Sequence, residues 1–283
     1  MAELCNILSV DVEDWFQSEG YAASIPRSKW DDCEWRVEEN VDRLLGLFSE
    51  KKVTATFFVL GCVAERFPSM VRRIGDSGHE IASHGWSHTP LWHLSRDAFS
   101  HEVRKSKRVL EEISGSEIFG YRAPTFSMVD RTLWAFEVLE ESGYFYDSSI
   151  FPVRHDRYGI VGAPLEIHRR PNKIWEIPLS VLEVGGVRLP VAGGGYFRLY
   201  PPCITHYAIR QMNIVGRPAV VYLHPWEFDP GQPRVPGVGL VATFRHHVGI
   251  GRNLEKVAQL LDAFAFAPAK DVLDRKMPVA IPA

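Results

Sequence analysis

The sequence predicts an α/β fold, a single irregular barrel in which parallel strands alternate with helices. Over the first two-thirds of the chain, short apolar runs rich in β-branched residues alternate with longer stretches of helical periodicity. No internal repeat, low-complexity tract or linker interrupts the 283 residues. Repeated βα units in one chain of this size favour one barrel over two domains.

The first half of the chain carries the clearest alternation. Its expected elements, in order, are a strand at 5–11, a helix from Trp35 to Phe48, a strand at 53–59, a helix at 62–76, a strand at 79–83 and a helix at 95–114. Gly78 is expected to end the second helix and Ser95 to cap the third, because those residue types are favoured at those positions.

The second half is less regular. Its expected elements are a strand at 117–122, a helix at 130–142, a strand at 144–148, a hairpin of 174–183 and 187–191, a helix at 201–214, a strand at 219–224 and a helix at 251–265. Gly185 and Gly186 suit the tight turn of the hairpin. Residues 150–173 are rich in Pro, Arg and His, and we expect them to form a long loop.

Charge and composition limit the partners of this protein. The chain has 32 Lys and Arg against 35 Asp and Glu, with a sequence pI of about 6.4. It therefore lacks the positive field that non-specific nucleic-acid binding requires. No apolar run approaches the roughly 18 residues of a membrane-spanning helix. We expect neither a nucleic-acid partner nor a membrane-spanning segment.

The N-terminus and the cysteines indicate a cytoplasmic location. Glu3 and the acids from Asp11 to Asp14 are unlike the basic and then apolar order of a secretory signal. The four cysteines are scattered without CxxC spacing. This arrangement suits reduced thiols better than a disulfide frame or a zinc knot.

Polar side chains follow directly after several predicted strands. They are Asp11, Glu13 and Asp14 after the first strand, His84 and His88 after the third, Arg122 after another and His224 after the last clear one. In βα barrels the carboxyl ends of the strands carry the reactive groups. We therefore expect these side chains to converge on one cavity.

His84 and His88 are candidate metal ligands. They are four residues apart, and on a helical turn both imidazoles would lie on one side at a spacing that can share a divalent ion. An HxxxH spacing also occurs by chance, so the carboxylates at another strand end matter. Two imidazoles and one carboxylate are a common catalytic ligand set for zinc and its neighbours.

The DVED segment supplies more acid than one metal needs. Residues two apart in an extended chain point to the same side, so Asp11 and Glu13 can face one cavity. One carboxylate would bind the metal while the other serves as general base. Asp14 replaces Glu13 if the strand has already bent, and at least one of the three acids is expected only to cap or face solvent.

The order of four motifs resembles one known family. DVED at 11–14, SHGWSH at 83–88, YRAP at 121–124 and YLH at 222–224 resemble the polysaccharide deacetylases of the NodB-homology, carbohydrate esterase family 4 group. The resemblance covers nearly the whole chain. Segments 9–17, 193–201 and 245–249 further resemble deacetylases encoded with bacterial exopolysaccharide and exosortase systems.

This resemblance implies a fold and an activity. The fold would be a distorted (β/α) barrel with an added hairpin and a C-terminal helix, in one domain over 1–283 with a family-specific extension from about 225. The activity would be removal of N-acetyl groups from N-acetylhexosamine units of a bacterial polysaccharide or its precursor. A divalent metal, zinc before cobalt, nickel or iron, would be the cofactor, and an acetylated carbohydrate would be the partner.

The resemblance also implies residue roles. They are Asp11 as general base, His84 and His88 as metal ligands, Arg122 as the group that orients the base, and His224 as the acid that protonates the departing amine. The common form of the family has an aspartate where this chain has Val12. We therefore expect Glu13 as the third ligand, with Asp14 as the alternative. Pro124 of YRAP and the backbone N–H near Thr125 would contact the substrate.

Aromatic and basic side chains extend the predicted site. Trp175 is expected either in the pocket wall or as a core residue. Trp15, Trp86, Trp92 and Trp226 adjoin the motifs and would stack on sugar or simply pack. Arg154, Arg157, Arg169, Arg170 and Lys173 lie in the loop and would meet an anionic glycan or a lipid-linked sugar phosphate, or only solvent.

Two other functions compete with the deacetylase reading. One is a metal-independent, allantoinase-like amidohydrolase of the same fold, which intact His84, His88 and Glu13 argue against. The other is a catalytically silent glycan-binding protein. The motifs name no particular sugar and carry no information on oligomeric state.

Overall fold

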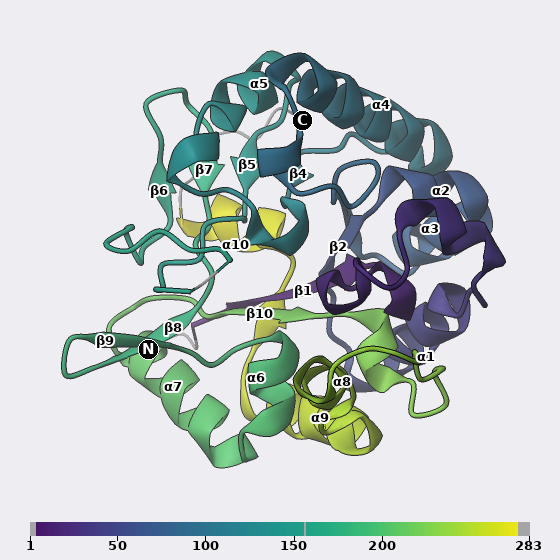
Figure 1. Cartoon of the computed structure of the whole chain (residues 1–283). Coiled ribbons are helices and arrows are strands. Elements are labelled where there is room, and N and C mark those ends of the chain that lie inside the picture. The colour runs from purple at the N-terminus through teal and green to yellow at the C-terminus, as the bar shows by residue number, and fades with distance from the viewer. Residues whose placement is uncertain (1–3, 156, 277–283) are drawn as a thin grey trace.

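A curled, mainly parallel sheet forms the centre of the computed structural model, which describes residues 4–155 and 157–276 (Figure 1). Its strands are β1 (Asn6–Val12), β2 (Thr56–Val59), β3 (Glu80–Ser83), β4 (Gly120–Tyr121), β5 (Tyr146–Asp147), β6 (His168–Arg169), β7 (Trp175–Glu176), β10 (Val220–Leu223) and β11 (Phe266–Ala267). The hydrogen-bonded order is β10-β1-β2-β3-β4-β5-β7-β6, and β11 pairs with β1.

Neighbouring strands are parallel except β6 and β7, which are antiparallel. Within the described residues the path runs from β10 to β6 without closing, so the sheet is a half-barrel. The predicted α/β class with an irregular barrel is confirmed. Because the paired strands run in the same direction, their carboxyl ends lie along one edge of the sheet.

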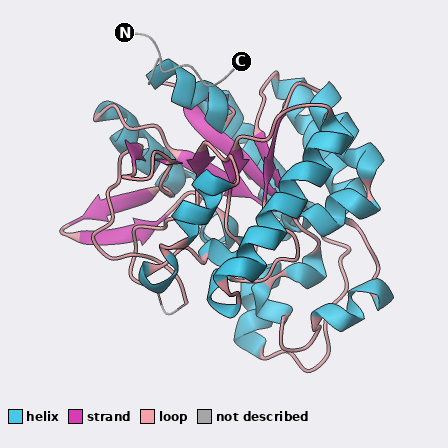
Figure 2. Ribbon diagram, turned by 90° about the horizontal axis from the view of Figure 1, so that it is seen from above, coloured by secondary structure: helices cyan, strands magenta, loops and turns pink. Residues whose placement is uncertain are grey.

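Helices pack around the sheet (Figure 2). They are α1 (Val37–Lys51), α2 (Gly61–Arg66), α3 (Pro68–Asp76), α4 (Arg96–Ser114), α5 (Ala135–Glu141), α6 (Gly194–Leu199), α7 (Pro202–Ile214), α8 (Leu240–His247), α9 (Asn253–Ala263) and α10 (Ala269–Lys276). The hydroxyl of Ser95 caps α4 as expected, because it accepts from the Ala98 N–H. None of the described helices is both long enough and apolar enough to cross a bilayer.

The alternation of side chains along β1 sets the position of the site. Leu8, Val10 and Val12 pack in the core cluster shared with the helices, whereas Ile7 belongs to a second cluster inside the curl of the sheet. Ser9 and Asp11 share the face of Ile7 because successive side chains in a strand point to opposite faces. Asp11 is thereby directed into the curl.

Several elements differ from the sequence-based expectations. The helix predicted at 62–76 is two helices, α2 and α3, since Pro68 has no N–H to continue α2 and instead begins α3. The helix predicted at 130–142 begins as a 3-10 turn, and α5 starts only at Ala135.

The second half also departs from expectation. The hairpin forms around Gly185 and Gly186, but its strands are only β8 (Val181–Val184) and β9 (Val187–Pro190), because Trp175–Glu176 pairs with β5 in the main sheet. Figure 2 shows this hairpin projecting from the body of the molecule. Helix α6 forms in the glycine-rich segment between the hairpin and α7, where no helix was predicted, and α10 follows the last predicted helix.

Candidate active site

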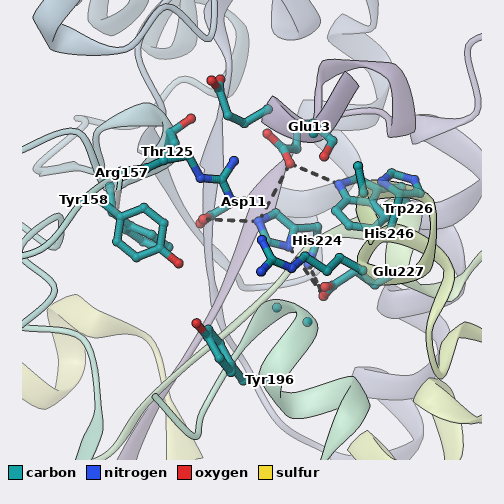
Figure 3. Close-up of a pocket in the computed structure, with 18 of the residues that line it drawn as sticks. Asp11, Glu13, Thr125, Arg157, Tyr158, Tyr196, His224, Trp226, Glu227 and His246 are labelled. Atoms are coloured by element: carbon teal, nitrogen blue, oxygen red, sulfur yellow. Dashed lines mark hydrogen bonds and ion pairs between the residues drawn. The ribbon is translucent and has the colours of Figure 1, made fainter. Parts of the chain in front are cut away.

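Acidic and histidine side chains from separate strands meet at the carboxyl edge of the sheet (Figure 3). A cavity of about 1000 Å³ opens there. Of the site residues predicted from the sequence, Asp11, Glu13, His84, His88, Thr125 and His224 line it. Arg122 lies directly behind Asp11 and is fully buried.

Glu13, His84 and His88 form a candidate metal-binding group. One ligand atom from each lies within 4.8 Å of the others, and Glu13 Oε2 is 2.5 Å from His88 Nε2. His84 Nδ1 donates a hydrogen bond of 2.9 Å to the Arg122 carbonyl, so the lone pair of this imidazole is on Nε2. One carboxylate beside two imidazoles is a donor set that fits a divalent cation.

Electrostatics in this group favour the forms that bind a cation. Burial lowers the pKa of His84 to about 4, which keeps its imidazole neutral at neutral pH. Burial alone would raise the pKa of Glu13, but His88, His224 and His84 together lower it below its ordinary value. A neutral imidazole and an ionised carboxylate are the states in which these side chains act as ligands.

The segment from His84 to His88 is not a helical turn, and that expectation is wrong. These residues form an irregular loop in which Gly85 and His88 have φ values of 77° and 53°. A left-handed conformation is uncommon outside glycine and costs about 1 to 3 kcal/mol at such a site. The loop, rather than helical periodicity, turns both imidazoles toward Glu13.

Asp14 is not part of the group, which corrects the alternative that made it a ligand. Its Oδ1 accepts from the Trp15 N–H at 2.8 Å, and its Oδ2 accepts from the N–H groups of Arg36 and Val37 at 2.7 and 2.8 Å. Val37 is the first residue of α1. Asp14 therefore caps a local turn and the start of a helix, with both carboxylate oxygens engaged.

Replacing Asp14 by alanine is expected to destabilise the protein by about 2 kcal/mol, because it leaves buried N–H groups without an acceptor. Metal content is expected to stay unchanged. The matched variant Glu13→Gln is expected to do the opposite, losing bound metal with a smaller change in stability. Urea unfolding and elemental analysis measure the two effects. Metal lost from Asp14→Ala and retained by Glu13→Gln would contradict the assignment.

Asp11 and Arg122 form a buried ion pair. Arg122 Nη1 donates to Asp11 Oδ1 at 2.7 Å and to Ser9 Oγ at 2.8 Å. Its Nε and Nη2 donate to the carbonyl and hydroxyl of Ser148, each at 2.9 Å. The guanidinium is 0% exposed, so this is not an ordinary surface pair. Arg122 thus fixes one oxygen of Asp11 and leaves the other toward the cavity.

His224 lines the cavity and lies among carboxylates. Its Nε2 is 3.7 Å from Glu13 Oε1 and 3.9 Å from Asp11 Oδ2, and its Nδ1 is 3.4 Å from Glu227 Oε2. Burial lowers the pKa of His224, but these carboxylates outweigh burial, Glu227 most strongly, and raise it to about 9. His224 is therefore placed and charged as a proton donor.

Glu227 and Arg198, which the sequence analysis did not assign, and Trp226, which it expected to stack on sugar or to pack, support His224 and Glu13. The Glu227 carboxylate pairs with the His224 imidazole. The buried Arg198 donates from Nε to Glu227 Oε1 at 2.9 Å. Trp226 donates from Nε1 to Glu13 Oε1 at 3.0 Å and stacks on His224 with 5.3 Å between ring centroids. The spacing of Glu227, three residues after His224, is the one available sequence signal.

Two of the predicted substrate contacts lie elsewhere. Trp175 is buried in the core cluster inside the sheet and is not among the described residues that line the cavity, which corrects its place in the pocket wall. Pro124 is buried and packs near Gly85 of the histidine loop. Thr125 does line the cavity, with φ of 56° and a hydroxyl that no described residue hydrogen-bonds.

Fold and site together define an α/β protein with an acid–histidine centre at the carboxyl edge of a curled parallel sheet. Two family models match adjacent parts of the chain. A model described as polysaccharide deacetylase matches residues 28–144, and one described as a domain of unknown function, DUF3473, matches residues 148–274. The chain contains a polysaccharide deacetylase domain of the NodB and carbohydrate esterase family 4 group.

Curated relatives include deacetylases of two substrates. The chain is 30% identical over 129 residues to a peptidoglycan-N-acetylglucosamine deacetylase of Bacillus cereus, covering 44% of this chain and 46% of the relative. It is 32% identical over 68 residues to a chitooligosaccharide deacetylase of Rhizobium leguminosarum, covering 24% of this chain and 32% of the relative. The chain thus spans less than half the length of these relatives.

Solved structures share the fold across nearly the whole chain. A candidate polysaccharide deacetylase from Mycobacterium smegmatis has a TM-score of 0.62 at 24% identity, covering 100% of this chain and 96% of that one. A carbohydrate esterase family 4 pseudoenzyme from Bacillus anthracis has a TM-score of 0.51 at 13% identity, covering 96% and 66%. The fold therefore occurs in a protein described as a pseudoenzyme, and activity must be argued from the site.

Proposed function

We propose that this chain is a metal-dependent hydrolase that removes N-acetyl groups from N-acetylhexosamine units of a bacterial polysaccharide or its precursor. The observation that carries the proposal is the meeting of Glu13, His84 and His88 with a buried Asp11–Arg122 pair and with His224 in one cavity. A pseudoenzyme or a pure glycan-binding protein would need no such set of acid, base and ligand groups.

The first step is attack of water on the acetamide carbonyl. A divalent ion at Glu13, His84 and His88 would supply the charge that acidifies water and polarises the carbonyl. Asp11 takes the proton of the attacking water on the oxygen that Arg122 leaves free. Arg122 keeps this carboxylate oriented, because its guanidinium is itself held by Ser9 and Ser148.

The second step is release of the amine. An amine leaves only when its nitrogen is protonated, and His224 is the group placed to donate that proton. Glu227 pairs with His224, and Arg198 in turn donates a hydrogen bond to Glu227. Thr125 lines the opposite part of the cavity, where its backbone N–H would donate to the oxygen that becomes negative. The products are acetate and a free amino sugar.

Finer statements belong to the same proposal. We assign zinc as the ion, since two imidazoles and one carboxylate are a common catalytic set for it. We place the reaction in exopolysaccharide synthesis, because segments 193–201 and 245–249 resemble deacetylases of such systems. We place the protein in the cytoplasm, where the thiols of Cys5, Cys33, Cys62 and Cys203 would stay reduced. Asp11 precedes one matched region and His224 lies within the other, so we propose that both regions act as one catalytic domain.

Removal of metal is the direct test. Purified protein is expected to hold about one divalent ion, and dialysis against a chelator is expected to abolish acetate release from N-acetylglucosamine oligomers. Addition of zinc is expected to restore it. The proposal is wrong if the chelated protein keeps full activity. Saturable binding of the oligomers without acetate release from metal-loaded protein would indicate a glycan-binding protein instead.

A further inference from the structure

Helix α8 gives the catalytic cavity an apolar wall. Gly239, Leu240, Val241, Ala242, Phe244 and Val248 all line the cavity that holds Asp11 and His224. Leu240, Val241 and Phe244 are 89%, 65% and 58% exposed. Leu199, at the end of α6, lines the same cavity and is 50% exposed. Contiguous exposed apolar side chains of this kind mark binding surfaces.

The apolar wall is held in place by buried polar contacts. Arg198 Nη1 donates to the carbonyls of His246 and Val248 at 2.6 and 2.7 Å, and its Nη2 donates to the Arg245 carbonyl at 3.1 Å. On another side, Tyr21 stacks on His246 with 4.3 Å between centroids. The end of α8 is thus tied to α6 and to the turn that contains Tyr21, so its apolar face is a fixed part of the cavity.

The composition of this wall does not match a plain glycan chain. Sugars present hydroxyl groups and C–H faces, and proteins bind them with polar groups and flat aromatic rings. Leu240 and Val241 are branched aliphatic side chains that offer no hydrogen bonds. Such a wall gains free energy only by covering hydrocarbon. A wall of this composition is suited to an apolar part of a ligand.

Basic side chains line the same cavity. Arg245 follows Phe244 on α8, and Arg157 comes from the long loop after β5; both are exposed. In the view of Figure 3, Arg157 and His246 lie on opposite sides of His224. Guanidinium groups bind phosphate oxygens with paired, charge-assisted hydrogen bonds. The cavity thus combines an N-acetyl hydrolysis centre, two candidate phosphate contacts and an apolar wall.

We propose that the substrate is an N-acetylhexosamine joined through phosphate to a hydrocarbon chain. The sugar lies over Asp11 and His224, the phosphate contacts Arg245, and the first part of the chain lies along Leu240, Val241 and Phe244. This inference rests on the proposed deacetylation and names its substrate class. It also separates two roles that the sequence left open for the loop arginines, because Arg157 lines the cavity.

Four compounds test the proposal on metal-loaded protein. They are the methyl and octyl phosphodiesters of N-acetylglucosamine and the corresponding methyl and octyl glycosides. Each methyl and octyl pair shares its head group and charge and differs only in the chain. The kcat/KM for the octyl phosphodiester is expected to exceed that for the methyl phosphodiester by about tenfold or more, as burial of several methylene groups predicts.

Variants locate the two contacts. The double variant Leu240→Ser/Phe244→Ser is expected to bring the octyl-to-methyl ratio to within about threefold of one. The control is Ile214→Ser, because Ile214 is 75% exposed and lies outside the cavity; it is expected to leave the ratio unchanged. Arg245→Gln is expected to lower the preference for the octyl phosphodiester over the octyl glycoside by about fivefold to tenfold.

The outcomes are separable. Acetate release from all four compounds with equal kcat/KM overturns this inference and leaves the deacetylase proposal standing. No release from any of them by protein that does hydrolyse N-acetylglucosamine oligomers also overturns this inference, and no release from the oligomers either overturns the deacetylase proposal itself. Loss of the octyl preference in Ile214→Ser as well as in the α8 variant overturns the role of α8. A second copy of the chain is the other possible occupant of this face, and sedimentation velocity tests it. A dimer that dissociates in the α8 variant would show that a second copy covers the face.

Discussion

The Asp11→Asn substitution is expected to lower kcat for acetamide hydrolysis by about a thousandfold while the protein keeps its metal. An amide has nearly the shape of the carboxylate but cannot take a proton from water, and a general base contributes about 10² to 10⁴ in rate. Glu13, His84 and His88 are unchanged in this variant. Acetate release and elemental analysis on the same sample measure the two properties.

The control for Asp11→Asn separates chemistry from folding. Because Arg122 loses its counter-ion in this variant, the assay is run well below the unfolding midpoint, which is recorded for each protein. Asp97→Asn, at an exposed position in the first turn of α4, is expected to keep full activity. An Asp11→Asn protein that is folded, metal-loaded and fully active would remove Asp11 from the mechanism.

The Arg122→Met substitution is expected to have the largest combined effect on stability and activity. It keeps much of the side-chain volume but removes every hydrogen bond to Ser9, Asp11 and Ser148, and it leaves the buried Asp11 carboxylate without its guanidinium partner. Breaking a buried ion pair in this way costs about 3 to 5 kcal/mol. The kcat is expected to fall by about a hundredfold or more, since the base is no longer oriented.

A double-mutant cycle distinguishes this pair from two independent residues. Asp11→Asn in the Arg122→Met background removes the unpaired charge, so the double variant is expected to be more stable than the sum of the single effects by about 1 to 3 kcal/mol. Arg122→Lys is expected to be intermediate in activity, because an ammonium cannot make the same fork of hydrogen bonds. Additive free energies of unfolding would show that the two side chains are not coupled.

Local patterns were sufficient for much of the fold. The period of two along residues 6–12 indicates which side chains of β1 face inward, and apolar runs located β2, β3 and β10 to within a few residues. They failed where a residue acts outside its own segment. Trp175 has the composition of a hairpin strand, yet it pairs with Tyr146 in the main sheet because β5 offers an unpaired edge there.

The division between Glu13 and Asp14 could not be read from the segment itself. Both follow β1 and both are acids, so local geometry permits either as the third ligand. Asp14 is excluded by N–H groups at Arg36 and Val37, which lie more than twenty residues later in the chain. The neighbours of His224 were equally hidden from local sequence, since Arg198, which contacts Glu227, comes from the separate helix α6.

By itself the sequence determined the α/β class, the strand ends that carry the reactive residues and the family that the motif order resembles. These features depend on side-chain periodicity and on residue order, which are local. Only the tertiary structure decided which acid accompanies His84 and His88, what holds Arg122 and His224, and that an apolar helix walls the cavity. Those outcomes depend on contacts between segments far apart in the chain, where the position of one partner is set by the packing of the whole sheet.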